Sequence, residues 1–120
     1  MIEYVKGDLF TKMPRNKNII IPHVCNNIGK WGKGFVIPLA QKYPEAKRAY
    51  LNGFAEKGYL PDTHRNGKGQ LVLVQEDPNI FIFNMIAQEG ILKMSNPKPI
   101  KYLWLINAMD TCKSHIETMR

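Results

Sequence analysis

The stretch that decides the fold is HVCNNIGKWGKGFVIPLAQKYP, residues 23–44, in which an apolar strand passes through a glycine-rich turn into a helix. The β-branched residues just before it extend the strand, so residues 18–25 are expected to be buried on both faces of a sheet. In open α/β sheets, ligands bind where loops leave the carboxyl ends of strands. The turn that follows the strand therefore lies where a ligand site is expected.

The glycines of this turn fit an anion site. Gly32 and Gly34 allow the backbone to approach a ligand closely and to take positive φ angles. The amides of Lys33, Gly34 and Phe35 would then lie at the start of the next helix, where unpaired N–H groups favour phosphate. The spacing matches neither a P-loop nor a dinucleotide-binding fingerprint. From the pattern alone, a phosphate site and a simple strand-to-helix turn are equally well supported.

Three polar residues, His23, Asn26 and Asn27, accompany the turn. A single histidine at a strand end is more often a satisfied core residue than a catalyst, and asparagines are common in turns. Together they form a denser polar cluster than a simple turn requires, which favours a functional role for this region.

The composition indicates one domain with one core, since the chain has 120 residues of which 44% are hydrophobic. No apolar run has the length of a membrane span, and the N-terminus lacks the apolar region of a signal peptide, so we expect a cytoplasmic protein without a membrane partner. Cys25 and Cys112 are too few for a disulfide scaffold and lack metal-ligand spacing, so no metal or other cofactor is expected. Cys25 is predicted to be a buried, reduced thiol.

The charge balance favours an anionic partner. Seventeen Lys and Arg residues stand against ten Asp and Glu residues, which gives a formal net charge of +7. The basic residues are scattered and do not alternate with aromatics as in a platform for single-stranded nucleic acid. A phosphate-bearing small molecule is therefore favoured over nucleic acid.

The rest of the sequence predicts an α/β domain with a mixed sheet. The expected order is β, β, α, α, β, β, α, with strands at 2–5, 18–25, 70–75 and 79–87 and helices at 35–43, 44–58 and 100–119. EDP at 76–78 indicates a hairpin, residues 58–69 read as a surface loop, and Pro22 indicates an irregularity or an edge position for its strand. The last helix is expected to turn an apolar face to the core, formed by residues 103, 106, 109 and 112 or 116.

Two segments together resemble a known family. YVKGDLF, residues 4–10, followed by IIIPHVCNNIGKWGKGFVIPLAQKYPEAKRAY, residues 19–50, is similar to the macro domain family and to its ADP-ribose-1''-phosphate phosphatase-like (Appr-1-p processing) branch. In that branch GD or GN ends the first strand, and H-x-C-N leads through G-x-W-G-x-G into a helix that ends near YP-x-A. NMIAQEGI, residues 84–91, resembles a second segment of the branch. The combination of these segments at matching spacing is specific for the family, whereas no single segment is.

The resemblance implies a three-layer α/β/α domain that spans residues 1–120. Members of the family continue beyond the long helix into a further strand and a second glycine-rich phosphate loop. Nothing in residues 101–120 matches these elements, so the chain is expected to lack the family's last strands and its second phosphate loop.

The resemblance also implies ADP-ribose, or a derivative of it, as the ligand. Asp8 matches the acidic residue that accepts from the adenine amine, with the Leu9 amide beside it, although a turn carboxylate is the simpler interpretation of Asp8 alone. Asn26 matches the asparagine that contacts the distal ribose. The first phosphate-binding loop of the family corresponds to Gly32, Lys33, Gly34 and Phe35.

Three more residues receive roles from the resemblance. His23 matches a histidine near the distal ribose that is a catalytic candidate in phosphatase-like members, where it would act as general acid or base. Trp31 would form one wall of the ribose site, although a tryptophan in such a turn can also be simply packed. Gln88 would line the distal ribose, and its alternative interpretation is a solvated loop residue. The glycohydrolase branch uses a lysine near position 88, and Gln88 argues against that covalent route.

We therefore expect an ADP-ribose-binding macro domain that hydrolyses ADP-ribose 1''-phosphate to ADP-ribose and phosphate. One alternative is a reader of ADP-ribose without turnover. A second is a hydrolase that removes ADP-ribose from protein or nucleic acid, and a third, not favoured, is a nucleic-acid-binding domain driven by the net charge.

Overall fold

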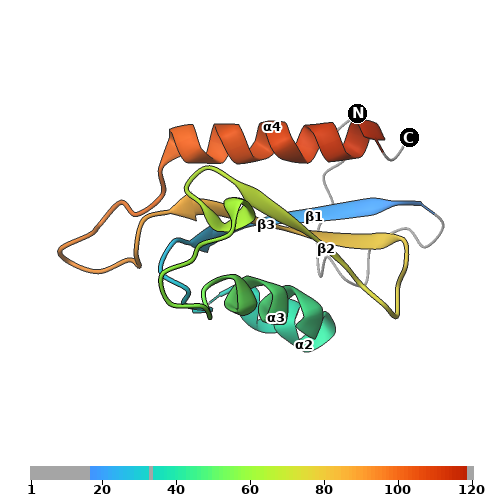
Figure 1. Ribbon diagram of the computed structural model, residues 1–120, viewed down its shortest axis with the longest axis horizontal. Coiled ribbons are helices and arrows are strands. Elements are labelled where there is room, and N and C mark those ends of the chain that lie inside the picture. Colours follow the sequence, from blue (N-terminus) through green and yellow to red (C-terminus); the bar gives the residue numbers. More distant parts are fainter. Residues whose placement is uncertain (1–16, 33, 119–120) are drawn as a thin grey trace.

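The computed structural model of the chain describes residues 17–32 and 34–118, and Figure 1 labels its elements. Outside the described residues lie the strand predicted at 2–5 and three predicted site residues, Asp8, Leu9 and Lys33. Within the described ranges, no helix combines the length and the apolar composition of a membrane span.

The described strands form one mixed sheet. Its spatial order is β1 (Ile19–Asn26), β3 (Ile80–Gln88) and β2 (Gly69–Leu73). β1 is parallel to β3, whereas β2 is antiparallel to β3, which confirms the predicted mixed sheet and the hairpin at 76–78. Among the described strands β1 lies at an edge, one of the two possibilities that Pro22 indicates, because proline cannot donate a hydrogen bond to a neighbouring strand. The expectation that residues 18–25 are buried on both faces is wrong, since Pro22 is exposed and Ile20 and Val24 are only half-buried.

Helices cover both faces of the sheet and give the three layers that the resemblance implies (Figure 1). On one face lie α2 (Val36–Lys42) and α3 (Pro44–Gly53), and on the other lies α4 (Tyr102–Thr118). A short 3-10 helix, η1 (Asp62–His64), interrupts the loop predicted at 58–69. The predicted helix boundary at Pro44 is confirmed, since this residue occupies the first turn of α3, where proline is tolerated.

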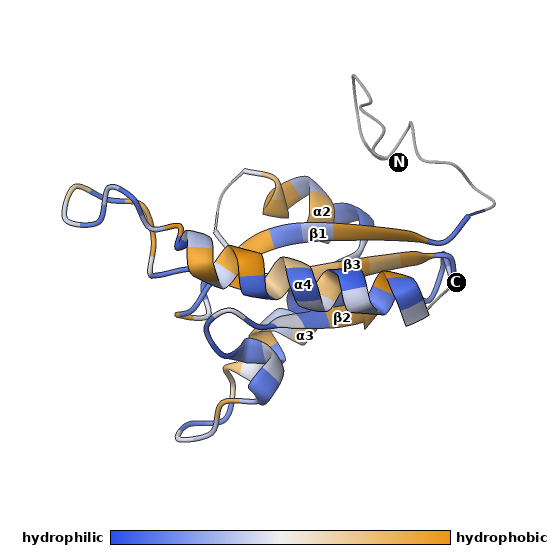
Figure 2. Cartoon of the chain, turned by 90° about the horizontal axis from the view of Figure 1, so that it is seen from above, coloured by the Kyte–Doolittle hydropathy of each residue, from blue (hydrophilic) through white to orange (hydrophobic). Residues whose placement is uncertain are grey.

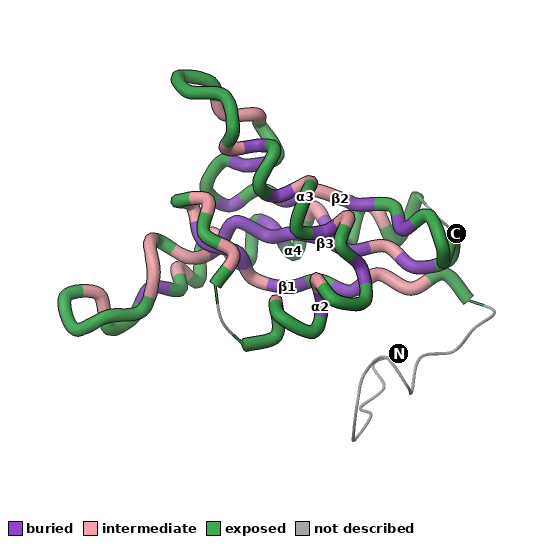
Figure 3. Tube along the Cα trace, turned by 90° about the horizontal axis from the view of Figure 1, so that it is seen from below, coloured by how far each residue is buried: buried purple, intermediate pink, exposed green. Residues whose placement is uncertain are grey.

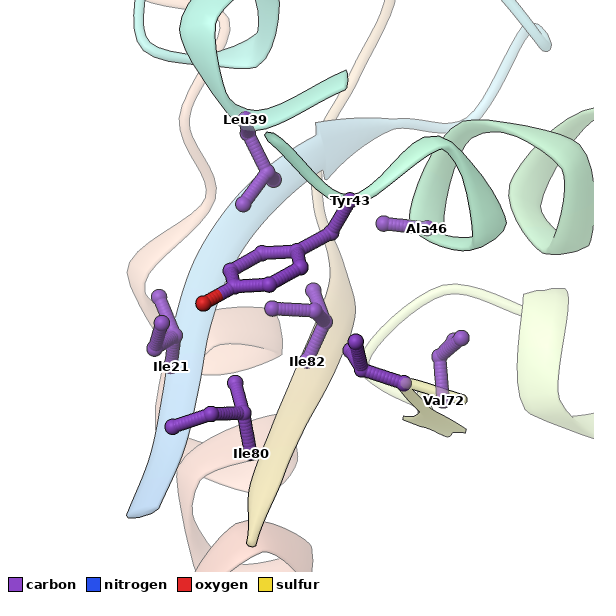
Figure 4. Close-up of a cluster of buried hydrophobic side chains, with 8 residues drawn as sticks. Ile21, Leu39, Tyr43, Ala46, Val72, Ile80 and Ile82 are labelled. Atoms are coloured by element: carbon purple, nitrogen blue, oxygen red, sulfur yellow. The ribbon is translucent and has the colours of Figure 1, made fainter. Parts of the chain in front are cut away.

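The larger part of the core lies between the sheet and the pair α2 and α3 (Figure 4). Leu39, Tyr43 and Ala46 from the helical side pack on strand residues and are almost fully buried. The remaining buried members of this cluster are Ile21, Val72, Val74, Ile80 and Ile82. β3 is buried on both faces because it is the central strand, which agrees with its continuous apolar sequence.

α3 ends earlier than predicted, at Gly53 instead of residue 58. A Cβ at Gly53 would lie 2.1 Å from the imidazole Nε2 of His64. The absence of a side chain at Gly53 lets His64 pack directly against the end of the helix, and residues 54–58 belong to the loop that leads to η1.

The prediction for the apolar face of the last helix was wrong at most positions. Leu103, Ile106, Met109 and Ile116 are exposed, with Leu103 at 76%, and Figure 2 shows hydrophobic residues along the outer side of α4. The helix packs instead through Ala108 and Cys112, with Leu105 beside them, on a sheet face that includes Phe83 and Met85. The small side chains at 108 and 112 let the helix approach the sheet closely. The helix therefore contacts the sheet along one edge of its apolar face, and the larger apolar side chains stay exposed.

Candidate functional site

The carboxyl ends of β1 and β3 meet at one end of the sheet because the two strands are parallel. A register shift between Cys25 and Asn26 brings Asn26 opposite Gln88. A cavity of about 440 Å³ lies at this end, bordered by the loops that follow both strands. Its lining residues are Val24, Cys25, Asn26, Lys30, Trp31, Gly32, Val36, Tyr50, Gln88, Ile91 and Leu92.

The cavity brings together four of the predicted site residues, namely Asn26, Trp31, Gly32 and Gln88. It does not include His23, Gly34 or Phe35 among its lining residues. Lys30 carries the single charged side chain in this lining, and most of the other lining side chains are apolar.

Asn26 organises the turn that borders the cavity. Its buried Oδ1 accepts from the backbone amides of Ile28 and Lys30, both at 3.1 Å, and from the Tyr50 hydroxyl at 2.7 Å. Its Nδ2 donates to the Lys30 carbonyl at 2.6 Å. An amide nitrogen carries two hydrogens, so within the described part of the chain one Nδ2 hydrogen remains for a ligand.

Asn27 fastens the turn to the loop after β3. Its Oδ1 accepts from the Gly90 amide at 3.0 Å, its Nδ2 donates to Asn66 Oδ1 at 3.2 Å, and its own amide donates to the Gln88 carbonyl at 2.9 Å. Asn27 therefore holds together the two loops that border the cavity and uses its side chain within the protein.

Trp31 is packed in the turn and also lines the cavity, and its contact with a ribose stays a prediction. Its Nε1 donates to the Val36 carbonyl at 3.0 Å. Its ring lies edge-on to the His23 imidazole, with centroids 5.4 Å apart, and tilted against Tyr50 at 5.6 Å. The indole thus forms a fixed wall between the cavity and the interior.

The backbone at Gly32 and at Gly34 is open. Gly34 has a φ of 81°, which explains why a glycine is favoured there. A Cβ at Gly32 or at Gly34 would meet no atom within 4 Å beyond its chain neighbours. At Gly32 neither the backbone angle nor the packing of the described residues requires a glycine, so the position is free for close approach of a ligand.

His23 lies beneath Trp31, with only 8% of its surface exposed. Its Nε2 donates to Asn84 Oδ1 at 2.5 Å, and Asn84 Nδ2 in turn donates to the Ala46 carbonyl at 3.1 Å. Burial lowers the pKa of His23, and the hydrogen bond to Asn84 opposes this in part. In this arrangement the neutral imidazole on β1 is connected to α3 by way of Asn84 on β3.

Sequence reasoning missed two residues that build the site, Asn84 and Tyr50. Asn84 stands alone as a polar residue in the apolar strand IFIFNMIA, and this contrast could have marked it as the partner of a buried polar group. Tyr50 donates to both the carbonyl and Oδ1 of Asn26 at 2.7 Å, and burial raises its pKa. Its place on the buried side of α3 gave no local sign of this contact.

The prediction for Cys25 is confirmed, because it is a free and buried cysteine whose pKa is raised by burial. The raised pKa favours the thiol form at neutral pH, which disfavours a nucleophilic role for this residue. In the described ranges, no three His, Cys, Asp or Glu side chains gather in a way that could hold a metal ion.

The comparisons with known proteins point to one family. The ADP-ribose 1''-phosphate phosphatase of Candida albicans is 34% identical over 83 residues, which cover 68% of this chain and 49% of that protein. The protein of the same name from Lodderomyces elongisporus is 46% identical over 63 residues, or 52% of this chain and 39% of that protein. No protein-family model matches the chain.

The solved structures give the same relationship over more of the chain. The structure of a macrodomain protein from Streptomyces coelicolor matches with a TM-score of 0.73 and 29% identity, and the match covers 88% of this chain and 66% of that one. The chain spans less than half the length of either phosphatase that it matches.

Proposed function

The chain is a macrodomain of the Appr-1-p processing type, and we propose that it binds ADP-ribose or a close derivative in the cavity at the ends of β1 and β3. The observation that carries the proposal is the cavity itself. There an available amide hydrogen of Asn26, the wall formed by Trp31 and the open backbone of Gly32 meet on one surface.

The distal ribose is proposed to lie against Asn26 and Gln88. The remaining Nδ2 hydrogen of Asn26 suits a sugar hydroxyl, and its orientation is fixed by three hydrogen bonds to Oδ1. Gln88 uses Nε2 to bond the Gly90 carbonyl at 2.9 Å, so its side-chain oxygen is available as an acceptor. The apolar walls from Val24 and Ile91 suit the carbon face of a sugar.

The diphosphate is proposed to run along residues 32–35. The backbone there is uncovered at Gly32 and Gly34, and Lys30 supplies positive charge at the same cavity. A phosphate oxygen can then reach main-chain N–H groups that a side chain would otherwise screen. Asp8 and Leu9, which lie outside the described residues, stay proposed contacts of the adenine.

Calorimetric titration with ADP-ribose tests the proposal, and Gly32→Glu is the informative variant. The fold tolerates a side chain at this position, while a carboxylate beside the diphosphate adds repulsion of about 1–2 kcal/mol, which is roughly a fivefold to thirtyfold weaker affinity. Gly32→Gln is the matched control, since it adds the same bulk without the charge. A folded wild-type chain that does not bind ADP-ribose would refute the proposal.

Hydrolysis of ADP-ribose 1''-phosphate is a second candidate function, favoured by the names of the two curated relatives. In this proposal His23 acts as general acid or base at the distal ribose. His23 does not line the cavity and its Nε2 is bonded to Asn84 Oδ1, so direct proton transfer to a ligand in the cavity requires the imidazole to move. A reader function needs no such movement.

Phosphate release from ADP-ribose 1''-phosphate separates the two functions. If His23 transfers the proton, His23→Gln lowers the rate at least about a hundredfold while ADP-ribose still binds. A wild-type chain that binds the ester without releasing phosphate is a reader.

A further inference from the structure

The loop between β3 and α4, residues 89–101, presents an apolar side chain to water at the rim of the proposed ADP-ribose pocket. Leu92 is 70% exposed, and it also lines the cavity together with Ile91. The loop, orange in Figure 1, runs past the ends of β1 and β3, and most of its residues are exposed (Figure 3). A single exposed leucine is ordinary on a protein surface. At the rim of a cavity, however, it offers apolar surface that a ligand in the cavity would cover.

The base of this loop is fixed to the end of the sheet. The Glu89 amide donates to the Pro99 carbonyl at 2.7 Å, and the Lys101 amide donates to the Ala87 carbonyl at 2.9 Å. An ion pair between the side chains of Glu89 and Lys101, at 3.1 Å, joins the same two ends. The loop therefore leaves the sheet and returns to it at one bonded position beside the cavity.

The part of the loop that carries Leu92 is held in place by Asn96. The Nδ2 of Asn96 donates to the carbonyl of Glu89 at 2.7 Å and to that of Ile91 at 3.1 Å. Its backbone exchanges two hydrogen bonds with Lys93, at 2.9 and 3.3 Å. Leu92 thus lies between two residues whose backbones are bonded to Asn96. A side chain on a backbone that is already fixed can contact a ligand without the entropy cost of ordering a loop.

Leu92 lines the same cavity as the residues proposed to contact the distal ribose. Asn26 and Gln88 line it too, and Trp31 forms one of its walls. The two side-chain amides suit the hydroxyl groups of a sugar, whereas the aliphatic side chain of Leu92 suits its C–H face. A ligand that ends at the diphosphate has no such face to offer at this position.

We propose that Leu92 determines specificity, because its side chain packs on the distal ribose and so favours ADP-ribose over ADP, which lacks that sugar. The inference rests on the proposed function, since it takes the distal ribose to lie at Asn26 and Gln88. It adds that an exposed aliphatic side chain, in addition to the two amides, distinguishes one nucleotide from the other. Covering most of a leucine side chain contributes enough free energy to be measured as an affinity.

The test is calorimetric titration of the wild type, Leu92→Ser and Met94→Ser with ADP-ribose and with ADP. Leu92→Ser is expected to bind ADP-ribose about fivefold to twentyfold more weakly than the wild type, because serine removes the apolar contact. Its affinity for ADP is expected to stay within about twofold of the wild type. Met94→Ser is the matched control, since Met94 is fully exposed on the same loop and is not among the lining residues of the cavity. Its affinities for both nucleotides should equal those of the wild type.

Two further measurements separate this contact from a structural role of Leu92. The midpoint of urea unfolding should be the same in Leu92→Ser and in the wild type, because the side chain is largely exposed without ligand. The heat capacity change of ADP-ribose binding should be less negative in Leu92→Ser, because less apolar surface is buried. Leu92→Met, which keeps the apolar surface, should bind ADP-ribose within about threefold of the wild type.

An equal loss of affinity for ADP-ribose and ADP in Leu92→Ser would overturn the inference and leave the proposed function intact. So would unchanged affinities for both nucleotides, or a heat capacity change equal to that of the wild type. If ADP-ribose does not bind to the folded wild-type chain, the proposed function fails and the inference fails with it.

Discussion

Gly53→Ala is expected to destabilise this protein, although the same substitution within an ordinary helix is stabilising. Alanine is favoured over glycine in a helix by about 1 kcal/mol. At Gly53, however, the added Cβ would lie 2.1 Å from His64 Nε2. This imidazole is 2% exposed, donates from Nε2 to the Tyr50 carbonyl at 3.1 Å and accepts at Nδ1 from the Thr63 hydroxyl at 2.9 Å, so it cannot move freely.

The magnitude follows from these opposing contributions. Overpacking costs about 1–3 kcal/mol. Loss of one hydrogen bond of the imidazole costs about 1 kcal/mol more, and the helix preference for alanine offsets about 1 kcal/mol. The free energy of unfolding should therefore fall by about 1–3 kcal/mol.

Urea unfolding measures this change in the wild type and in a His64→Ala background. In that background the clashing ring is absent, so Gly53→Ala should be neutral or stabilising. The reasoning is refuted if Gly53→Ala stabilises the otherwise wild-type protein, or if its cost is the same in both backgrounds.

Three further perturbations have expected outcomes. Tyr50→Phe removes the hydroxyl that holds Asn26, so urea unfolding should show a loss of about 1–2 kcal/mol and calorimetry a weaker affinity for ADP-ribose; unchanged values would contradict the role given to Tyr50. Burial lowers the pKa values of His23 and His64 below 6.5. As the pH falls through 6.5, these histidines therefore take up protons in the unfolded chain but not in the folded chain. The free energy of unfolding should thus decrease between about pH 7.5 and about pH 5.5, by up to about 1.4 kcal/mol per histidine, and a flat profile would count against this account. On α4, Leu103→Ser should change thermal stability by less than about 0.5 kcal/mol while Ala108→Leu costs about 1–3 kcal/mol, and the reverse order would mean that the helix packs through the other face.

Local patterns predicted most of the elements. The β-branched run before residue 26, the proline at 44 and the EDP turn at 76–78 each impose a backbone preference that the fold keeps. The pattern on the last helix gave its existence and length but not its contact face. The apolar face of this helix is wider than the part that packs on the sheet. Tertiary contacts, and not the local sequence, determine that Ala108 and Cys112 are the residues buried there.

The sequence predicted which residues lie at the cavity where those residues belong to the turn beside it, and not where their position depends on a partner far away in the chain. Asn26 and Gly32 lie in the turn that lines the cavity, and the sequence of that turn identifies them. The position of His23 depends on Asn84, which is 61 residues away in the chain and is brought opposite it by the parallel register of β1 and β3. The chain between β1 and β3 passes through α2, α3, η1 and β2, so no local pattern around His23 reveals this pairing.

The central claim is that ADP-ribose binds at the ends of β1 and β3, and NMR titration of the labelled chain tests it most directly. On addition of ADP-ribose, the largest shifts are expected at the side-chain amide of Asn26, the backbone amide of Gly32, the indole N–H of Trp31 and the side-chain amide of Gln88. Amides in the C-terminal half of α4, beyond Cys112, which do not line the cavity, should move least. Shifts confined to α4, or no shifts in a folded chain, would contradict the account.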